Sequence, residues 1–344
     1  MKLLKFILPI LLVTISLAGC NSTPSEKISE ETYDDLNENQ EMVSDPLQKA
    51  IYIVSMNANQ VTVIDPLSNT AKGTIQVEQR PFDIVLEPSG KRAYITGSYS
   101  NDVIVLDTTT NKILTKIPVQ NTPSHLAISP DGRYLFVVNL GSASVSIIDT
   151  QIGSVIENIK VGSTPYDIVL SPDGQTAVVA NYGENTVSVI DTNSRKVINT
   201  IPAGQGVDGL AFSKDGKYLY TGAHGDNQDW TKVWVHEMPG GKVIKEITTD
   251  KMPTFLKLTP DGRYLWILIH QSDKVWVLDT TTNTITKVFA VGKNPQGMTF
   301  SKDGQQAFIA NTDSNTVSVV DTDSYQILAT IPVGRGPMGV SGKE

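Results

Sequence analysis

Three titratable side chains recur at one position of consecutive sequence repeats. Asp83, His125 and Asp167 follow one another at intervals of 42 residues, and each lies seven residues before a glycine that ends a turn. Carboxylate and imidazole groups together suit several divalent cations, and they also hydrogen-bond small polar ligands. If the fold brings consecutive repeats together, we expect these residues to bind a small molecule or, on weaker grounds, a divalent cation.

Two further histidines depart from the repeat at a second position. His224 and His270 follow the predicted second strand of neighbouring copies, where other copies carry Met, Ser, Leu, Tyr or Thr. The loop that holds His224 contains a four-residue insertion and also Asp226. In an antiparallel unit, this loop and the start of the first strand lie at the same end of the strands. We therefore expect His224, Asp226 and His270 on the same face as His125.

The repeat itself predicts the elements that position these residues. Each copy holds four short runs rich in β-branched residues, separated by turns of Pro, Asp, Asn and Gly, which indicates four strands. The turn glycines that mark the copies are 42, 42, 42, 46 and 42 residues apart and are Gly90, Gly132, Gly174, Gly216, Gly262 and Gly304. A period of about 40–45 residues with four strands per copy is typical of a β-propeller.

The two ends of the chain share one copy. The sequence contains seven predicted third strands but only six first turns, so one copy lacks its first strand. Residues 336–341 at the C-terminus align with residues 294–299, the first strand of the preceding copy. We therefore predict an all-β fold over residues 49–344, a seven-bladed β-propeller of four-stranded antiparallel blades whose first blade is closed by the C-terminal strand. In this ring, Asp83, His125 and Asp167 would surround one side of the channel mouth. The alternative is that they only solvate a water-filled channel.

Acidic residues that every copy keeps favour a structural role. They end the third strands and are mostly followed by Thr, and they are Asp65, Asp107, Asp149, Asp191, Glu237, Asp279 and Asp321. Asp side chains commonly accept main-chain N–H bonds in turns. We predict that the aspartates cap the turn after each third strand.

The repeat also resembles a known family. The pattern DGxxxxVxNxxxxTVSVIDTxxxxVxxTIPVG, which is seen most clearly around residues 173–204, is similar to the YVTN-type β-propeller repeat of bacterial and archaeal surface proteins. The resemblance covers residues 49–344 and implies the propeller fold. Relatives of this repeat occur in surface-layer proteins, in haem d1 domains and beside quinone-dependent dehydrogenases. The resemblance therefore leaves the function open, because one fold supports many functions.

The N-terminal residues 1–19 have the form of a signal peptide. Lys2 and Lys5 lie at the start of an apolar run that is too short to span a bilayer, and Leu17-Ala18-Gly19 then leads to Cys20, the only cysteine of the chain. This resembles a bacterial lipoprotein signal, which implies lipidation of Cys20 and an extracytoplasmic protein anchored to the cell membrane. The alternative is an ordinary cleaved signal with an incidental cysteine.

Residues 20–48 are rich in Asp, Glu, Asn and Ser and poor in apolar side chains, which predicts a disordered acidic tether. The formal net charge of the whole chain is −8. Because phosphate binding needs clustered Lys and Arg, and no basic run is present, we expect no nucleic-acid partner.

The sequence is compatible with three functions. The first is a binding or scaffold protein for an extracellular protein or a small molecule, and it is favoured because the sequence carries no P-loop, HExxH or GxSxG motif. The second is a metal-dependent, lactonase-like hydrolase or lyase with its site at the channel mouth. The third is a protein that handles a haem or quinone cofactor, although no c-type haem attachment motif is present.

Overall fold

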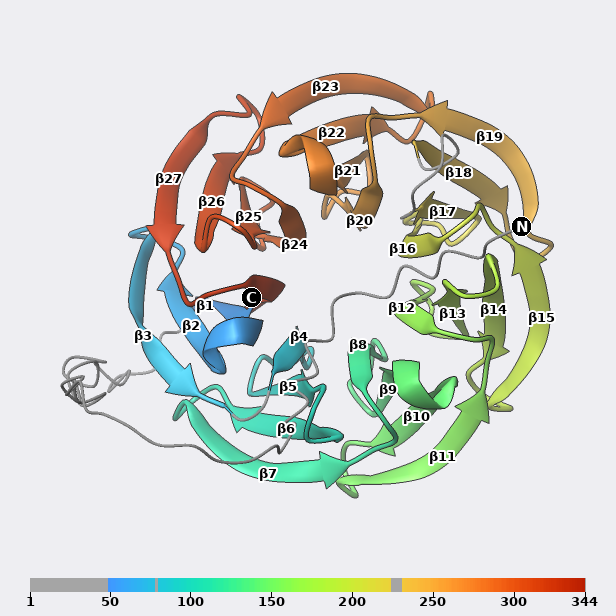
Figure 1. The fold of residues 1–344 in the computed structure, drawn as a ribbon, viewed down its shortest axis with the longest axis horizontal. Helices are drawn as coiled ribbons and strands as arrows, with labels where there is room; N and C mark the ends of the chain where they lie inside the picture. Colours follow the sequence, from blue (N-terminus) through green and yellow to red (C-terminus); the bar gives the residue numbers. More distant parts are fainter. Residues whose placement is uncertain (1–48, 78–79, 224–230, 344) are drawn as a thin grey trace, which may run out of the picture. The chain divides into compact units, whose positions relative to one another are not determined.

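The computed structural model describes residues 49–77, 80–223 and 231–343, which form seven four-stranded antiparallel sheets. The sheets stand around a central axis as the blades of a β-propeller, and the chain passes once around the ring (Figure 1). The predicted fold class is therefore confirmed. Residues 1–48, 78–79, 224–230 and 344 lie outside this description, and so do the predictions made for the signal peptide, Cys20, the tether, His224 and Asp226.

The strands of the first four blades run from the innermost to the outermost as follows. The first blade holds β28 (Pro337–Lys343), β1 (Ala50–Ser55), β2 (Gln60–Asp65) and β3 (Thr70–Gln76). The second holds β4 (Pro81–Leu86), β5 (Arg92–Gly97), β6 (Asp102–Asp107) and β7 (Lys112–Pro118). The third holds β8 (Pro123–Ile128), β9 (Tyr134–Asn139), β10 (Ser144–Asp149) and β11 (Ser154–Lys160). The fourth holds β12 (Pro165–Leu170), β13 (Thr176–Asn181), β14 (Thr186–Asp191) and β15 (Lys196–Pro202).

The last three blades repeat this order. The fifth holds β16 (Val207–Phe212), β17 (Tyr218–Ala223), β18 (Lys232–Glu237) and β19 (Lys242–Thr248). The sixth holds β20 (Pro253–Leu258), β21 (Tyr264–Ile269), β22 (Lys274–Asp279) and β23 (Thr284–Ala290). The seventh holds β24 (Pro295–Phe300), β25 (Gln306–Asn311), β26 (Thr316–Asp321) and β27 (Ile327–Pro332). Short 3₁₀ helices follow some second strands and are η1 (Met56–Ala58), η2 (Leu140–Ser142) and η4 (His270–Ser272).

The C-terminal strand closes the first blade, as the repeat count predicts. β28 pairs antiparallel with β1, so that Ile51 lies opposite Gly342 and Ile53 lies opposite Val340. Closure joins the seventh blade to the first through a sheet made from both ends of the chain. In an open ring, the two end blades would each expose an apolar face. Closure covers these faces, so that each blade packs against a neighbour on both sides.

The core lies between the blades. In β13, alternate side chains point to opposite faces, as they do in any strand. Val178 packs with Leu210 of the following blade, and Val179 packs with Phe136 of the preceding blade. Since both faces of the blade are covered, the middle strands read as continuous apolar runs rather than as alternating ones.

The aspartates that end the third strands cap the following turns, as predicted. The main-chain N–H of Leu67 donates to Asp65 at 2.9 Å, and that of Thr109 donates to Asp107 at 2.7 Å. These hydrogen bonds recur in the other blades, for example between Gln151 N and Asp149 at 3.0 Å. The repeated carboxylates are thus part of the turns. Among the described residues, no helix is long and apolar enough to cross a membrane.

Candidate functional site

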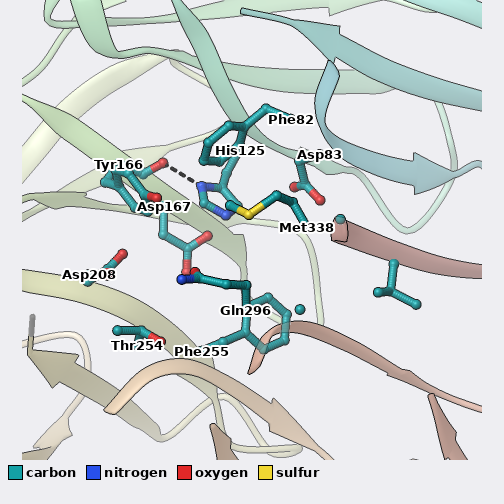
Figure 2. Close-up of a pocket in the computed structure, with 13 residues that line it drawn as sticks. Phe82, Asp83, His125, Tyr166, Asp167, Asp208, Thr254, Phe255, Gln296 and Met338 are labelled. Carbon is teal, nitrogen blue, oxygen red and sulfur yellow. Dashed lines mark hydrogen bonds between the residues drawn. The ribbon is translucent and has the colours of Figure 1, made fainter. Parts of the chain in front are cut away.

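A pocket lies at the mouth of the central channel, on the face where the innermost strands begin. We call this the start face, and the opposite face, which carries the Pro-Asp-Gly turns, the turn face. The cavity measures about 30 Å³, which is room for one or two water molecules. The pocket is lined by Phe82, Asp83, His125, Tyr166, Asp167, Asp208, Thr254, Phe255, Gln296, Gly297, Met338, Gly339 and Val340 (Figure 2).

An irregularity at the start of each innermost strand explains the crowding of side chains in this mouth pocket. In β12, Pro165 pairs with Asn181 and Ile168 pairs with Val179, so the register slips between them. The two intervening residues, Tyr166 and Asp167, therefore do not alternate across a regular ladder. Both line the pocket (Figure 2).

The carboxylates of Asp83 and Asp167 each join two blades. In each case Oδ1 accepts the main-chain N–H of the next residue in the chain, at 2.8 and 2.7 Å respectively. Oδ2 accepts an N–H from the innermost strand of the following blade, that of Leu126 at 3.4 Å and that of Leu210 at 3.0 Å. These aspartates thus hold neighbouring blades together at the channel mouth while they line the pocket.

The imidazole of His125 continues this series. Its Nδ1 lies 2.9 Å from the carbonyl oxygen of Tyr166 in the following blade. The ring makes an edge-on contact with Phe82, with 5.1 Å between the ring centroids, and a tilted contact with Tyr166 at 5.0 Å. His125 is therefore packed between two aromatic rings, and its orientation is set by the main chain.

The charges of the mouth pocket perturb one another. Burial raises the pKa of Asp167 to about 6, although the imidazole of His125 opposes the rise. Burial likewise raises the pKa of Asp83, again against the effect of His125. Burial would lower the pKa of His125, but the carboxylates of Asp167, Asp83 and Asp208 outweigh it, and that pKa lies above its ordinary value. The imidazole of His125 thus interacts electrostatically with three carboxyl groups.

The structure places the other predicted site residues differently. His270 begins η4 on the start face, and its Nδ1 lies 2.9 Å from Nε2 of Gln296, which lines the pocket. His270 is therefore linked to the mouth pocket through Gln296 and does not line it. His224 and Asp226 are outside the described residues, so their position stays a prediction.

Side chains one position before the predicted ring also line the pocket, and the sequence did not predict them. Asp208, Tyr166, Phe82, Thr254, Gln296 and Met338 line the pocket. The position eight residues before the turn glycine varies among the copies as strongly as the position seven residues before it. Its residues are Phe82, Ser124, Tyr166, Asp208, Thr254, Gln296 and Met338. This variation could have identified them as site residues. However, side chains alternate strictly in a regular strand, which predicts that these would point away from the channel mouth.

A metal site gains no geometric support. Within residues 49–77, 80–223 and 231–343, no group of three or more His, Cys, Asp or Glu side chains is arranged to hold a metal ion. For Asp83 and Asp167 the reason is visible, because both oxygens of each carboxylate already accept main-chain hydrogen bonds.

Comparisons with known proteins find one matching family and many solved structures of similar fold. The family model of the cytochrome D1 haem domain matches residues 88–214 and 226–341. A search of curated proteins finds no match. Among solved structures, Kuenenia stuttgartiensis hydrazine synthase is 25% identical with a TM-score of 0.69, and the match covers 76% of this chain and 89% of that chain.

Two further structures are less similar in sequence. Dihydro-haem d1 dehydrogenase NirN, solved in complex with DHE, is 18% identical with a TM-score of 0.66, over 89% of this chain and 77% of that chain. A putative 6-phosphogluconolactonase from Bacteroides fragilis is 16% identical with a TM-score of 0.70, over 86% of this chain and 98% of that chain. At these identities the likeness concerns the fold alone.

Proposed function

The chain belongs to the cytochrome D1 haem domain family, and from this premise we propose that it is a binding propeller whose mouth pocket receives the ammonium group of an amine ligand. The observation that carries the proposal is the grouping of Asp83, Asp167 and Asp208 around a water-sized cavity with one imidazole. These three carboxyl groups outnumber the two cationic side chains that act on them, His125 and Lys257. A cation is therefore attracted to this pocket and an anion is repelled.

The aromatic residues of the mouth pocket support the same ligand class. Phe82, Tyr166 and Phe255 line the cavity together with the carboxylates. Aromatic faces attract ammonium groups, and carboxylates nearby add to that attraction. The cavity of about 30 Å³ fits an ammonium group but not a drug-sized molecule, since sites for the latter measure about 300–1,000 Å³. The rest of the ligand would lie on the start face.

A haem does not fit the mouth pocket as it stands. A tetrapyrrole is far larger than the cavity of about 30 Å³. Haems also carry carboxylates, and the residues that line the cavity include Asp83, Asp167 and Asp208 but neither Arg nor Lys. The imidazole of His125 is a suitable donor for iron, yet its surroundings would repel the acidic edge of the group. We therefore derive no step through haem for this chain.

A divalent cation is the second ligand that the residues suggest, as in the lactonase-like hydrolase or lyase predicted as an alternative. It is less well supported than an amine, because no group of three or more His, Cys, Asp or Glu side chains among the described residues is arranged to hold a metal ion. Elemental analysis of the purified protein distinguishes the two. Stoichiometric metal would replace the amine proposal.

We also propose that the propeller acts outside the cytoplasmic membrane, held by a lipid on Cys20. The support is the sequence Leu17-Ala18-Gly19-Cys20 after a short apolar run. The test is fractionation of cells that produce the full chain or Cys20→Ala. We expect the unaltered chain in the membrane fraction and the variant released from it. Equal partition of the two would contradict the anchor and leave the pocket proposal untouched.

Binding of amines can be measured directly. Isothermal titration of the purified protein with butylamine, and with butanol as the uncharged control, should show binding of the amine alone. Asp208→Asn should weaken it about tenfold, since a charged hydrogen bond contributes about 1.5–3 kcal/mol. Asp173→Asn on the turn face, where Asp173 accepts from the hydroxyl of Ser171 at 2.6 Å, is the matched control. Equal binding of butanol and butylamine would refute the proposal.

A further inference from the structure

The mouth pocket contains a buried hydroxyl group that no described residue hydrogen-bonds. Thr254 lines the pocket (Figure 2) and is only 6% exposed. Its Oγ1 atom has no hydrogen-bond partner among the described residues. A buried hydroxyl without a partner raises the free energy of the folded state. A polar group that enters the cavity and bonds Oγ1 therefore removes this cost.

A bulge in the sixth blade sets the position of Thr254. In β20, Pro253 pairs with Ile269 and Phe255 pairs with Leu268, so Thr254 is an extra residue with no residue opposite it in β21. A bulge of this kind redirects a side chain from the regular alternation of the strand. It explains how both Thr254 and Phe255, which are neighbours in the chain, line the same pocket.

Thr254 lies on the side of the pocket that carries Asp208 (Figure 2). The main chains of the two innermost strands approach closely here, since a Cβ on Gly209, the residue after Asp208, would lie 2.3 Å from the carbonyl oxygen of Thr254. The hydroxyl of Thr254 thus adds a neutral hydrogen-bonding group to the acidic part of the pocket.

Another blade shows what a hydroxyl at this repeat position can do instead. Ser124 holds the same position in the third blade, eight residues before the turn glycine. Its Oγ donates to the carbonyl oxygen of Tyr166, the equivalent residue of the next blade, at 3.0 Å. Thr254 makes no such bond to Gln296, the residue equivalent to Tyr166 in the seventh blade. The hydroxyl of Ser124 therefore joins two blades, whereas that of Thr254 can bond a ligand.

We propose that Thr254 makes the mouth pocket selective for primary ammonium groups over quaternary ones. This inference rests on the function proposed above, because it concerns the same ligand. A primary ammonium group has three N–H donors, of which Oγ1 of Thr254 accepts one and the carboxylates accept the others. A quaternary group has the same charge but no N–H. Its methyl groups also exceed a cavity of about 30 Å³, which is close to the size of a water molecule.

Isosteric variants isolate the hydroxyl. Thr254→Val removes it and keeps the shape of the side chain, and Thr254→Ser retains it. Thr62→Val is the matched control, because Oγ1 of Thr62 is also buried without a hydrogen-bond partner among the described residues, but Thr62 lies in β2 and does not line the pocket. Thermal unfolding checks that each variant keeps its fold, and Thr254→Ala takes the place of Thr254→Val if the latter does not fold.

The probes are butylamine and butyltrimethylammonium, titrated calorimetrically into the full-length protein. We expect the unaltered protein to bind butylamine about tenfold more tightly than butyltrimethylammonium. Thr254→Val should weaken the binding of butylamine about tenfold and leave that of butyltrimethylammonium unchanged. Thr254→Ser and Thr62→Val should bind butylamine as the unaltered protein does.

Three results would overturn the selectivity proposed for Thr254. They are binding of butyltrimethylammonium at least as tight as that of butylamine, an unchanged affinity of Thr254→Val for butylamine, and an equal loss in Thr62→Val. The first would indicate an aromatic cage for quaternary ammonium. In each of these cases the proposed function stands if butylamine still binds more tightly than butanol. If it does not, the proposed function fails, and the role of Thr254 fails with it.

Discussion

The Nδ1 atom of His125 lies 2.9 Å from the carbonyl oxygen of Tyr166. Because a carbonyl only accepts, Nδ1 donates the proton, and Nε2 is the ring nitrogen that gains or loses a proton. A main-chain group of the fourth blade thus fixes the orientation of a histidine on the third. This contact, with those of Asp83 and Asp167, makes the mouth pocket both a junction between blades and a charged site.

The affinity of the mouth pocket for an amine should rise with pH. The pKa of Asp167 is about 6, so this residue gains its negative charge as pH rises through that value. His125 loses its positive charge only above its ordinary pKa, because its pKa is raised. Both changes make the pocket more negative. Titrations of butylamine should show about tenfold tighter binding at pH 8 than at pH 5. Asp167→Asn should reduce the pH dependence of butylamine affinity. An unchanged pH dependence in that variant would show that another group causes it.

His125→Ala should destabilise the protein most at mildly acidic pH. A histidine whose pKa is raised in the folded state contributes stability that is fully present below its unfolded pKa of about 6.5 and is lost as pH rises through the folded pKa. We expect a loss of about 1–3 kcal/mol in urea unfolding at pH 6, and a smaller loss at pH 9. His270→Ala is the control and should show no such difference, since His270 lies outside the charged cluster.

Gly297→Ala should destabilise the junction between the seventh and first blades. A Cβ at Gly297 would lie 2.1 Å from the carbonyl oxygen of Met338, and a main-chain atom of β28 cannot give way cheaply. Overpacking of this kind costs about 1–3 kcal/mol. Gly240→Ala is the matched control, since no atom lies within 4 Å of its added Cβ. Equal midpoints of thermal unfolding for the two variants would contradict the close approach of these strands.

Removal of residues 337–344 should disrupt the ring. The truncation takes away β28, which pairs with β1 in the first blade, and exposes Ile51 and Ile53, which are 2% and 0% exposed in the intact chain. We expect loss of cooperative thermal unfolding and rapid cleavage by protease. Truncation of Glu344 alone is the control. A truncated chain that unfolds at the original temperature would show that closure contributes little to stability.

The sequence by itself determined the architecture, because each sequence repeat encodes one four-stranded blade. The period gave the number of blades, and the unmatched first strand located the closure by β28. The repeated aspartates could be assigned a role from the sequence, since a residue such as Asp107 accepts hydrogen bonds from main-chain and hydroxyl groups within its own turn. Local hydrogen bonds of this type follow from spacing along the chain alone.

Only the tertiary structure decided which side chains share a site. Asp208 joins Asp83, His125 and Asp167 because the register slips at the start of each innermost strand, as between Val207 and Leu210. Strand periodicity does not predict such a slip. Repeats specify what each blade is, whereas sites arise from where unlike residues of several blades converge.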